Sequence, residues 1–283
     1  MGRVEQIIGM PAWWTGPAGA DVLSWERECA QALLADAFGF HALQLGLPAL
    51  DALQANRMPH RWLAVESREQ AVSGTPDGSF DDGRVHLLCE FDALPFAGQS
   101  LDLVVLAHAL ESARDPHLAL REVERVLVPE GRVLIFGFNP YSLWRLRQPW
   151  RHDGAVATAG VGAHSGSACP VGEAIAYRRL RDWLRLLGFE VEGARFGCFR
   201  PPLTQRQWLD RFRWMDTTGQ RWWPVFGAVY ALQAVKRVRG MRLVGLARRQ
   251  ARYASASRTV VAASQSHREW SSPSQDTGPG GRS

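Results

Sequence analysis

The sequence predicts an α/β fold of the doubly wound type, in which helices cover a mostly parallel β-sheet. Short apolar runs alternate along the chain with segments of helical periodicity, and this order is typical of βαβ units. The chain has 283 residues, of which 46% are hydrophobic and 22% charged. It is therefore long enough for one large domain with further segments, and its composition excludes collagen-like, disulfide-scaffold and wholly disordered classes.

The first half of the chain carries the clearest elements. Apolar spacing predicts a helix over 20–38, and Gly39 follows it as a suitable C-terminal residue. One or two helical turns are expected at 51–58, and a turn-rich loop at 73–83. Asp115 followed by Pro116 predicts a helix start, because an acidic N-cap and a proline at the first helical position favour one. Apolar runs predict five buried strands, at 40–47, 61–66, 84–89, 101–106 and 132–138.

The second half is less regular. Residues 151–170 are small and aperiodic, which indicates a mobile loop, and a helix over 172–187 and a strand over 189–199 follow it. The resulting scheme is an N-terminal arm (1–19), one domain (20–249) and a disordered tail (250–283). Within the domain we expect a mobile loop at 140–170, a helical insertion at 203–240 and a last strand at 242–248.

Charge is unevenly distributed along the chain. The total is 33 − 28 = +5, while residues 200–240 sum to +6 and residues 1–199 to −6. The basic C-terminal third makes anionic partners plausible. Four cysteines without metal-ligand spacing predict no metal site and indicate a reducing compartment. We see neither a signal peptide nor an apolar run long enough to span a membrane, so a cytoplasmic protein is expected.

Polar residues at the strand ends are the candidate ligand contacts. In a doubly wound sheet, ligands bind outside the carboxyl ends of the strands, where the strand order reverses. This rule selects Gly46, Glu66, Glu90 and His108. Glu66 lies 66 − 46 = 20 residues after Gly46, the spacing at which an acid accepts hydrogen bonds from a ribose. The alternative is that Glu66 is simply a solvated acid.

A set of motifs across 84–139 carries a family resemblance. The motifs are Glu90-Phe-Asp-Ala-Leu-Pro-Phe96, Ser100-Leu-Asp-Leu-Val-Val-Leu-Ala-His108, Asp115-Pro116, Leu120-Arg-Glu-Val-Glu-Arg-Val-Leu127 and Pro129-Glu-Gly131. This stretch resembles the class I S-adenosylmethionine-dependent methyltransferases, in particular the type 11 group that includes ubiquinone and menaquinone methylases. The continuation Asn139-Pro140-Tyr-Ser-Leu-Trp144 suggests a proteobacterial branch of unassigned substrate. The resemblance is specific over 84–139, moderate over 20–83, and rests on element order beyond residue 140.

The resemblance implies a seven-stranded, Rossmann-like sheet with an antiparallel last strand, and S-adenosylmethionine as cofactor. Glu66 would hold the ribose hydroxyls, and Glu90 would lie by the adenine amino group, with Asp92 as a second candidate for that contact. Ala107 and His108 would border the methionine portion and the methyl acceptor. His108 is the candidate general base. The alternative for His108 is a structural histidine hydrogen-bonded at the end of a strand.

The turn after the first strand departs from the family pattern. Gln44 stands where relatives carry an acid, and only Gly46 remains of a glycine-rich turn. Pro48 lacks an amide donor, so the approach of the cofactor is less favourable. We still assign Gln44 and Gly46 to the cofactor site. The departure also motivates an alternative function, a methyltransferase-fold binding or regulatory protein with impaired catalysis.

An aromatic and basic segment at 208–240 has three open interpretations. In the first, the segment is a helical insertion that packs its aromatic side chains onto the sheet. In the second, it is an amphipathic cover that lies on a membrane surface or over a lipophilic substrate. In the third, it is an RNA-binding face. Nucleic acid is the least favoured partner. The predicted function is methyl transfer to an unidentified acceptor, for which a small metabolite or a lipophilic molecule is favoured.

Overall fold

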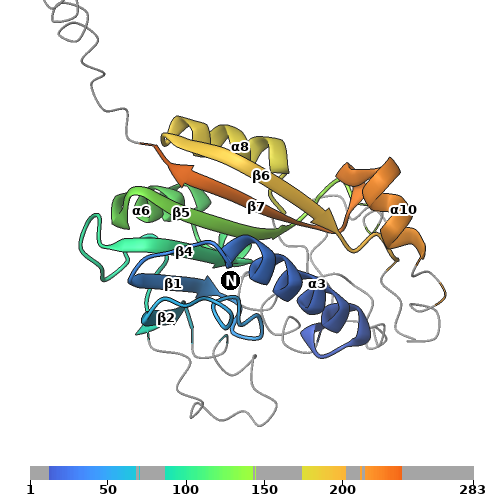
Figure 1. Cartoon of the computed structure of the whole chain (residues 1–283), viewed down its shortest axis with the longest axis horizontal. Helices are drawn as coiled ribbons and strands as arrows, with labels where there is room; N and C mark the ends of the chain where they lie inside the picture. Colours follow the sequence, from blue (N-terminus) through green and yellow to red (C-terminus); the bar gives the residue numbers. More distant parts are fainter. Residues whose placement is uncertain are drawn as a thin grey trace, which may run out of the picture. The chain divides into compact units, whose positions relative to one another are not determined.

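The fold is described by a computed structural model, which covers residues 13–67, 70, 87–142, 144, 174–201, 211 and 214–237. Its centre is one seven-stranded sheet in the order β3-β2-β1-β4-β5-β7-β6 (Figure 1). Strands β1 to β5 pair in parallel, and β7 is antiparallel to both β5 and β6. The strands are β1 (His41–Gly46), β2 (His60–Val65), β3 (Leu87–Leu88), β4 (Leu101–Ala107), β5 (Leu127–Phe138), β6 (Phe189–Gly197) and β7 (Val229–Lys236).

The prediction of a doubly wound α/β fold is confirmed, and the sheet is mixed because of β7. The sheet order reverses between β1 and β4. In a sheet of this kind that point marks the ligand crevice.

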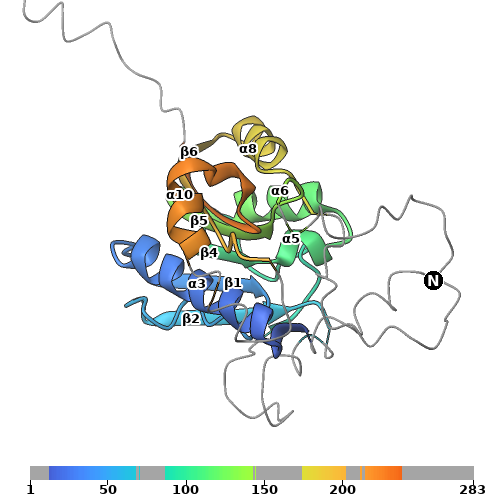
Figure 2. The ribbon, with the colours of Figure 1, turned by 90° about the vertical axis from the view of Figure 1, so that its right-hand side faces the viewer.

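Helices lie on both faces of the sheet (Figures 1 and 2). The helical elements are α3 (Pro17–Leu34), α5 (Ala109–Ser112), α6 (Pro116–Val126), α8 (Tyr177–Leu186), α10 (Trp214–Trp222) and the 3₁₀ turn η1 (Pro224–Phe226). On one face, apolar residues of α6 and α8 pack in one cluster with Leu43 and Leu45 of β1. On the other face, α3 packs in a second cluster that includes Ala42 of β1. Successive side chains of a strand point to opposite faces, so β1 belongs to both cores.

The helix start predicted at Asp115-Pro116 is confirmed, and a glycine ends α8. The Asp115 carboxylate accepts hydrogen bonds from the amides of His117 and Leu118, at 2.8 and 3.2 Å, and so caps α6. Gly188, which follows α8, has a φ of +83°, a conformation that a glycine adopts without strain.

The clearest correction concerns the last strand. Residues 229–236, predicted as part of a helical insertion, form β7, which lies between β5 and β6 as the second strand from one edge of the sheet. All eight residues of β7 are buried. A short apolar run buried on both faces has no period-2 alternation, so its pattern does not separate it from a buried helix. The segment 242–248, predicted as the last strand, lies outside the described residues.

Several predicted bounds also change. The helix predicted over 20–38 spans Pro17–Leu34, and Trp13 and Trp14, which precede it, are buried in the same cluster. Residues 51–58 form turns and no helix. The helix predicted over 172–187 begins at Tyr177. The loop at 73–83, the tail at 250–283 and most of the loop at 140–170 lie outside the described residues.

Candidate functional site

The carboxyl ends of β1 and β4 meet at Gly46 and Ala107. These two residues pair in the sheet register, and the Leu47 amide donates to the Ala107 carbonyl at 3.0 Å. Gly46 has a φ of +97°, and a Cβ atom at this position would lie 2.3 Å from the Ala107 oxygen. The chain can therefore turn at this point only because residue 46 is glycine.

Gln44 holds the turn that follows β1. Its side-chain amide donates to the carbonyls of Leu47 and Leu50, and its oxygen accepts from the Ala52 amide at 3.0 Å. The side chain is buried, and these three hydrogen bonds all lie within the turn. Gln44 was predicted as a cofactor contact, and in this conformation its polar atoms are used to shape the backbone.

Leu47 and Pro48, which follow Gly46 in the turn, are half-buried. Leu47 packs against the apolar cluster beneath α3. The side chain that replaces a glycine therefore contributes to the core on the α3 face. The end of β1 thus keeps one glycine with a positive φ, Gly46, and the turn that follows it is held by the hydrogen bonds of Gln44.

The three candidate acids follow β2 and β3. Glu66 is half-buried directly after β2, Glu90 is exposed two residues after β3, and Asp92 is half-buried in the next turn. Burial raises the pKa of the Cys89 thiol, and the Glu66 carboxylate adds to that rise. The Glu66 carboxylate is therefore close enough to Cys89 to affect its thiol, and Glu90 is the next residue along the chain. The acids that follow β2 and β3 thus lie at the same edge of the sheet.

Glu122 and Arg125 on α6 hold the segment that contains these acids in place. Their side chains approach to 2.6 Å. Glu122 accepts from the Leu94 amide at 3.0 Å, while Arg125 donates to the carbonyls of Leu94 and Phe96, at 3.2 and 2.8 Å. The ion pair therefore ties α6 to the turn after β3.

His108 lies at the end of β4 between two carboxylates. Its Nε2 is 2.8 Å from Oε1 of Glu26 on α3, and its Nδ1 is 2.8 Å from Oε2 of Glu111 on α5. The His108 and Glu111 side chains are 4% and 5% exposed, and that of Glu26 is fully buried. Burial acts to lower the pKa of His108, but the two carboxylates outweigh it and raise this pKa to about 10. We call this group the Glu26–His108–Glu111 triad.

This geometry bears directly on the predicted general base. Both ring nitrogens of His108 are engaged by carboxylates, and the raised pKa keeps the ring protonated at neutral pH. In this conformation neither nitrogen can accept a proton from a methyl acceptor. The structure therefore matches the alternative interpretation, a histidine hydrogen-bonded at a strand end. Its partners are carboxylates rather than backbone groups.

Sequence reasoning missed Glu26 and Glu111. Glu26 is 82 positions from His108, and it lies on the buried apolar face of α3 together with Val22 and Cys29. A charged residue among apolar ones on a helix face could have marked it as a buried polar group, but its partner lies too far away in sequence to be recognised. Glu111 follows His108 by three residues, a spacing that could have suggested a pair. Within the described residues, no group of three or more His, Cys, Asp and Glu side chains could hold a metal ion.

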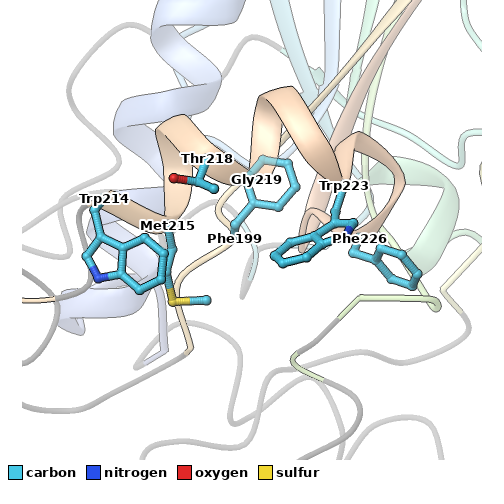
Figure 3. Close-up of a pocket in the computed structure, with 7 residues that line it drawn as sticks. All are labelled: Phe199, Trp214, Met215, Thr218, Gly219, Trp223 and Phe226. Atoms are coloured by element: carbon cyan, nitrogen blue, oxygen red, sulfur yellow. The ribbon is translucent and has the colours of Figure 1, made fainter.

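An apolar cavity of about 230 Å³ opens beside α10 and η1 (Figure 3). Its lining residues are Phe199, Trp214, Met215, Thr218, Gly219, Trp223 and Phe226. Gly219 lets α10 lie on Phe199, since a Cβ atom there would be 2.4 Å from the Phe199 ring. One of the three interpretations of this segment placed its aromatic side chains on the sheet. Tyr230 is a buried residue of the sheet strand β7, whereas Trp222 and Trp223 are 70% and 57% exposed.

The cavity belongs to the same edge of the sheet as Gly46 and Ala107. Since β7 is antiparallel to β5, its first residue, Val229, pairs with the last residue of β5, Phe138. The next residue, Asn139, donates from its side chain to the carbonyls of Val225 and Gly227, which flank the end of η1. The turn that lines the cavity is therefore fastened to the carboxyl end of β5.

Comparison with known proteins gives a consistent result. Residues 49–135 match the model of a methyltransferase domain family. Protein YafS of Escherichia coli (strain K12), described as uncharacterized, is 30% identical over 196 residues, which are 67% of this chain and 69% of YafS. The malonyl-[acyl-carrier protein] O-methyltransferase of Halorhodospira halophila is 42% identical over 68 residues, 24% of this chain and 23% of that enzyme.

Two solved structures share the fold. A SAM-dependent methyltransferase of Thermotoga maritima superposes with a TM-score of 0.52 at 15% identity, covering 80% of this chain and 93% of the other. A chain of the complex between the Haloferax volcanii Trm112 methyltransferase activator and a methyltransferase gives a TM-score of 0.51 at 18% identity, covering 78% and 93%. At these identities the likeness concerns the fold alone.

The strand order, the glycine turn at the switch point and these matches define a class I S-adenosylmethionine-dependent methyltransferase. Within this class, the chain belongs to the type 11 methyltransferase family. It is therefore an enzyme with S-adenosylmethionine as its cofactor, and the alternative of an impaired binding or regulatory protein is not favoured. No helix among the described residues is long and apolar enough to cross a bilayer.

Proposed function

We propose that this methyltransferase acts on a small-molecule acceptor with a substantial apolar part. The observation that carries this proposal is the cavity of about 230 Å³ whose lining is almost entirely carbon. A concave apolar site of this kind suits an acyl chain or an aromatic ring, because burying apolar surface stabilises the complex. Its position beyond β5, at the edge that holds Gly46 and Ala107, favours its use by the acceptor.

We assign the cofactor to the carboxyl ends of β1, β2 and β4. The residues fit it, because β1 ends at the switch point in a residue without a side chain, Gly46, and carboxylates follow the next two strands. Glu66 would accept hydrogen bonds from the ribose hydroxyls, and Glu90 or Asp92 would lie near the adenine amino group. Ala107 would border the methionine portion. Gln44 would act indirectly, through the turn that it holds.

When bound, S-adenosylmethionine supplies a methyl group already activated by its sulfonium. The chain then has to orient the acceptor in line with this methyl group and exclude water, and such positioning accounts for much of the rate in reactions of this kind. The aromatic residues beside η1 would bind the apolar part of the acceptor. In the arrangement described, His108 holds its proton between two carboxylates and contributes no base.

Relatives named for particular acceptors are compatible with this proposal but do not carry it. They include the malonyl-[acyl-carrier protein] O-methyltransferase and a ubiquinone/menaquinone biosynthesis C-methyltransferase of Hahella chejuensis. These two matches span only 24% and 22% of this chain. The acceptor therefore has to be found by experiment.

The test is methyl transfer from tritiated S-adenosylmethionine into a panel of quinones, acyl thioesters and polar metabolites. We expect product with an acceptor that has a long apolar part, and a raised KM for it in Thr218→Phe, which fills the cavity. Leu186→Phe, at an exposed position on α8, is the matched control. Transfer to polar metabolites alone, with no effect of Thr218→Phe, would refute the proposal.

A peripheral contact with a lipid surface is a second candidate function of this region. Five apolar side chains on α10 and η1 are 45–70% exposed, namely Trp214, Trp222, Trp223, Val225 and Phe226. Arg221, between them in sequence, is also exposed. Indole rings next to basic side chains favour the interface of anionic membranes.

Co-sedimentation with phosphatidylglycerol vesicles tests this contact. The double variant Trp222→Ala/Trp223→Ala should remain in the supernatant, whereas Leu186→Ala should sediment like the wild type. Equal sedimentation of wild type and double variant would contradict it. Retention of the wild type on RNA, with no binding to vesicles, would instead support a nucleic-acid partner.

A further inference from the structure

The Glu26–His108–Glu111 triad is a buried group whose charges do not cancel. In formal charges, two carboxylates and one imidazolium sum to −1. Among the described residues, Oε2 of Glu26 has no hydrogen-bond partner although the side chain is fully buried. Holding an excess charge in the interior costs stability unless another group compensates it.

The aromatic side chains that lie against the His108 ring carry no compensating charge, and the Arg195 guanidinium interacts with the Cys29 thiol on α3. Trp14 and Phe138 lie against the His108 ring, with ring centroids 5.0 and 4.5 Å away. Burial raises the pKa of both Cys198 and Tyr230 well above the usual values, and nearby carboxylates add to both shifts. Both groups therefore remain neutral. The Arg200 guanidinium is already paired with Asp21 and Asp216.

The triad is built on the backbone that forms the switch point. His108 directly follows Ala107, the partner of Gly46, and the His108 amide donates to the Phe136 carbonyl at 3.2 Å. A Cβ atom on Gly46 would lie 3.2 Å from Cα of Ala109. Glu111 accepts a hydrogen bond from the Phe138 amide, so the ends of β4 and β5 are both tied to the triad.

We propose that the Glu26–His108–Glu111 triad supplies the negative charge that favours the sulfonium cofactor over its neutral thioether product. The triad would thereby replace the acid that the family resemblance expects at the position of Gln44. Glu26, His108 and Glu111 are positioning residues in this scheme. They act through the electrostatic field at the carboxyl ends of β1 and β4 and touch neither reactant. This inference rests on the proposed placement of the cofactor at the carboxyl ends of β1 and β4.

The experiment compares the binding of S-adenosylmethionine and S-adenosylhomocysteine by calorimetry, on the full chain. The two ligands share the ammonium, carboxylate, ribose and adenine groups and differ in the charge at sulfur. The ratio of their dissociation constants therefore isolates the effect of that charge. Glu26→Gln keeps the shape of the side chain and removes one charge, while Glu28→Gln does the same at an exposed position of α3.

We expect Glu26→Gln to weaken S-adenosylmethionine binding about tenfold, the effect of roughly 1.4 kcal/mol from one charge acting across a protein interior. S-adenosylhomocysteine binding should change less than about twofold, and Glu28→Gln should leave both constants unchanged. If Glu26→Gln fails to fold, Glu111→Gln removes the same charge from the other carboxylate.

Two outcomes separate failure of this inference from failure of the proposed cofactor site. An unchanged ratio in a variant that still binds S-adenosylhomocysteine would overturn the role of the triad and leave the site intact. Absence of binding of both ligands to the wild type would overturn the site, and the role of the triad with it.

Discussion

Replacement of Gly46 by alanine tests the geometry of the switch point. The new Cβ would lie 2.3 Å from the Ala107 oxygen, whereas ordinary contacts begin near 3.4 Å, so the two strand ends would have to separate by about 1 Å. The 3.0 Å hydrogen bond from the Leu47 amide to the same oxygen would be lost or stretched.

The magnitude follows from three contributions. A positive φ costs an alanine about 1–2 kcal/mol, overpacking about 1–3 kcal/mol, and the lost hydrogen bond about 1 kcal/mol. Gly46→Ala should therefore lower the free energy of unfolding by roughly 3–6 kcal/mol, a large share of the stability of a typical domain. It should also weaken cofactor binding, because the strand ends that form the crevice move.

Urea denaturation followed by circular dichroism measures the loss of stability. Gly193→Ala is the matched control, since a Cβ atom at Gly193 meets nothing within 4 Å. This control should unfold within about 0.5 kcal/mol of the wild type. If Gly46→Ala lost less than about 1 kcal/mol and bound S-adenosylhomocysteine normally, the close approach described at this turn would be wrong.

Three further predictions concern polar groups in the core. Gln44→Glu should lower the free energy of unfolding by about 3–5 kcal/mol, because a carboxylate would face the carbonyls of Leu47 and Leu50. Urea midpoints measure this loss, with Gln31→Glu at an exposed position as the control. Equal midpoints for the two variants would contradict it. His108 has a pKa raised from 6.5 to about 10, so its stabilising contribution of about 5 kcal/mol is complete below pH 6.5 and lost as the pH rises through 10. The stability difference between the wild type and His108→Gln should accordingly shrink from pH 6.5 to 10, a range in which Tyr230 and Cys198 stay neutral; a difference independent of pH would exclude a protonated His108. Lys236→Met should lower the free energy of unfolding in urea by about 2–3 kcal/mol, since the ammonium donates to the carbonyls of Glu124 and Leu127. Arg237→Met, at an exposed position, should leave the urea midpoint unchanged. Equal midpoints for the two variants would show that the Lys236 ammonium does not stabilise the fold.

Much of the fold could be predicted because its signals are local. The runs that became β1, β2, β4 and β5 are apolar over lengths typical of buried strands, and Asp115-Pro116 marks a helix start by its own chemistry. The strand β7 could not be recognised from its pattern. Its burial on both faces depends on pairing with β5 and β6, which no local period reports.

The candidate site divides in the same way. Gly46 was identified from its place at a strand end, and the structure adds the positive φ and the close approach that require it. The environment of His108 could not be predicted, because Glu26 comes from a helix 82 residues earlier. Gln44 was expected to face a cofactor, but its hydrogen bonds depend on how the turn at 47–52 folds back.

Calorimetric titration with S-adenosylhomocysteine tests the central assignment most directly, with Glu66→Ala compared to the wild type and to Glu28→Ala. If Glu66 holds the ribose, its removal should raise the dissociation constant about ten- to hundredfold, the effect of a hydrogen bond to a charged group. Wild type and Glu28→Ala should bind alike. Equal affinities for all three proteins would show that the nucleoside does not lie beside Glu66 at the end of β2.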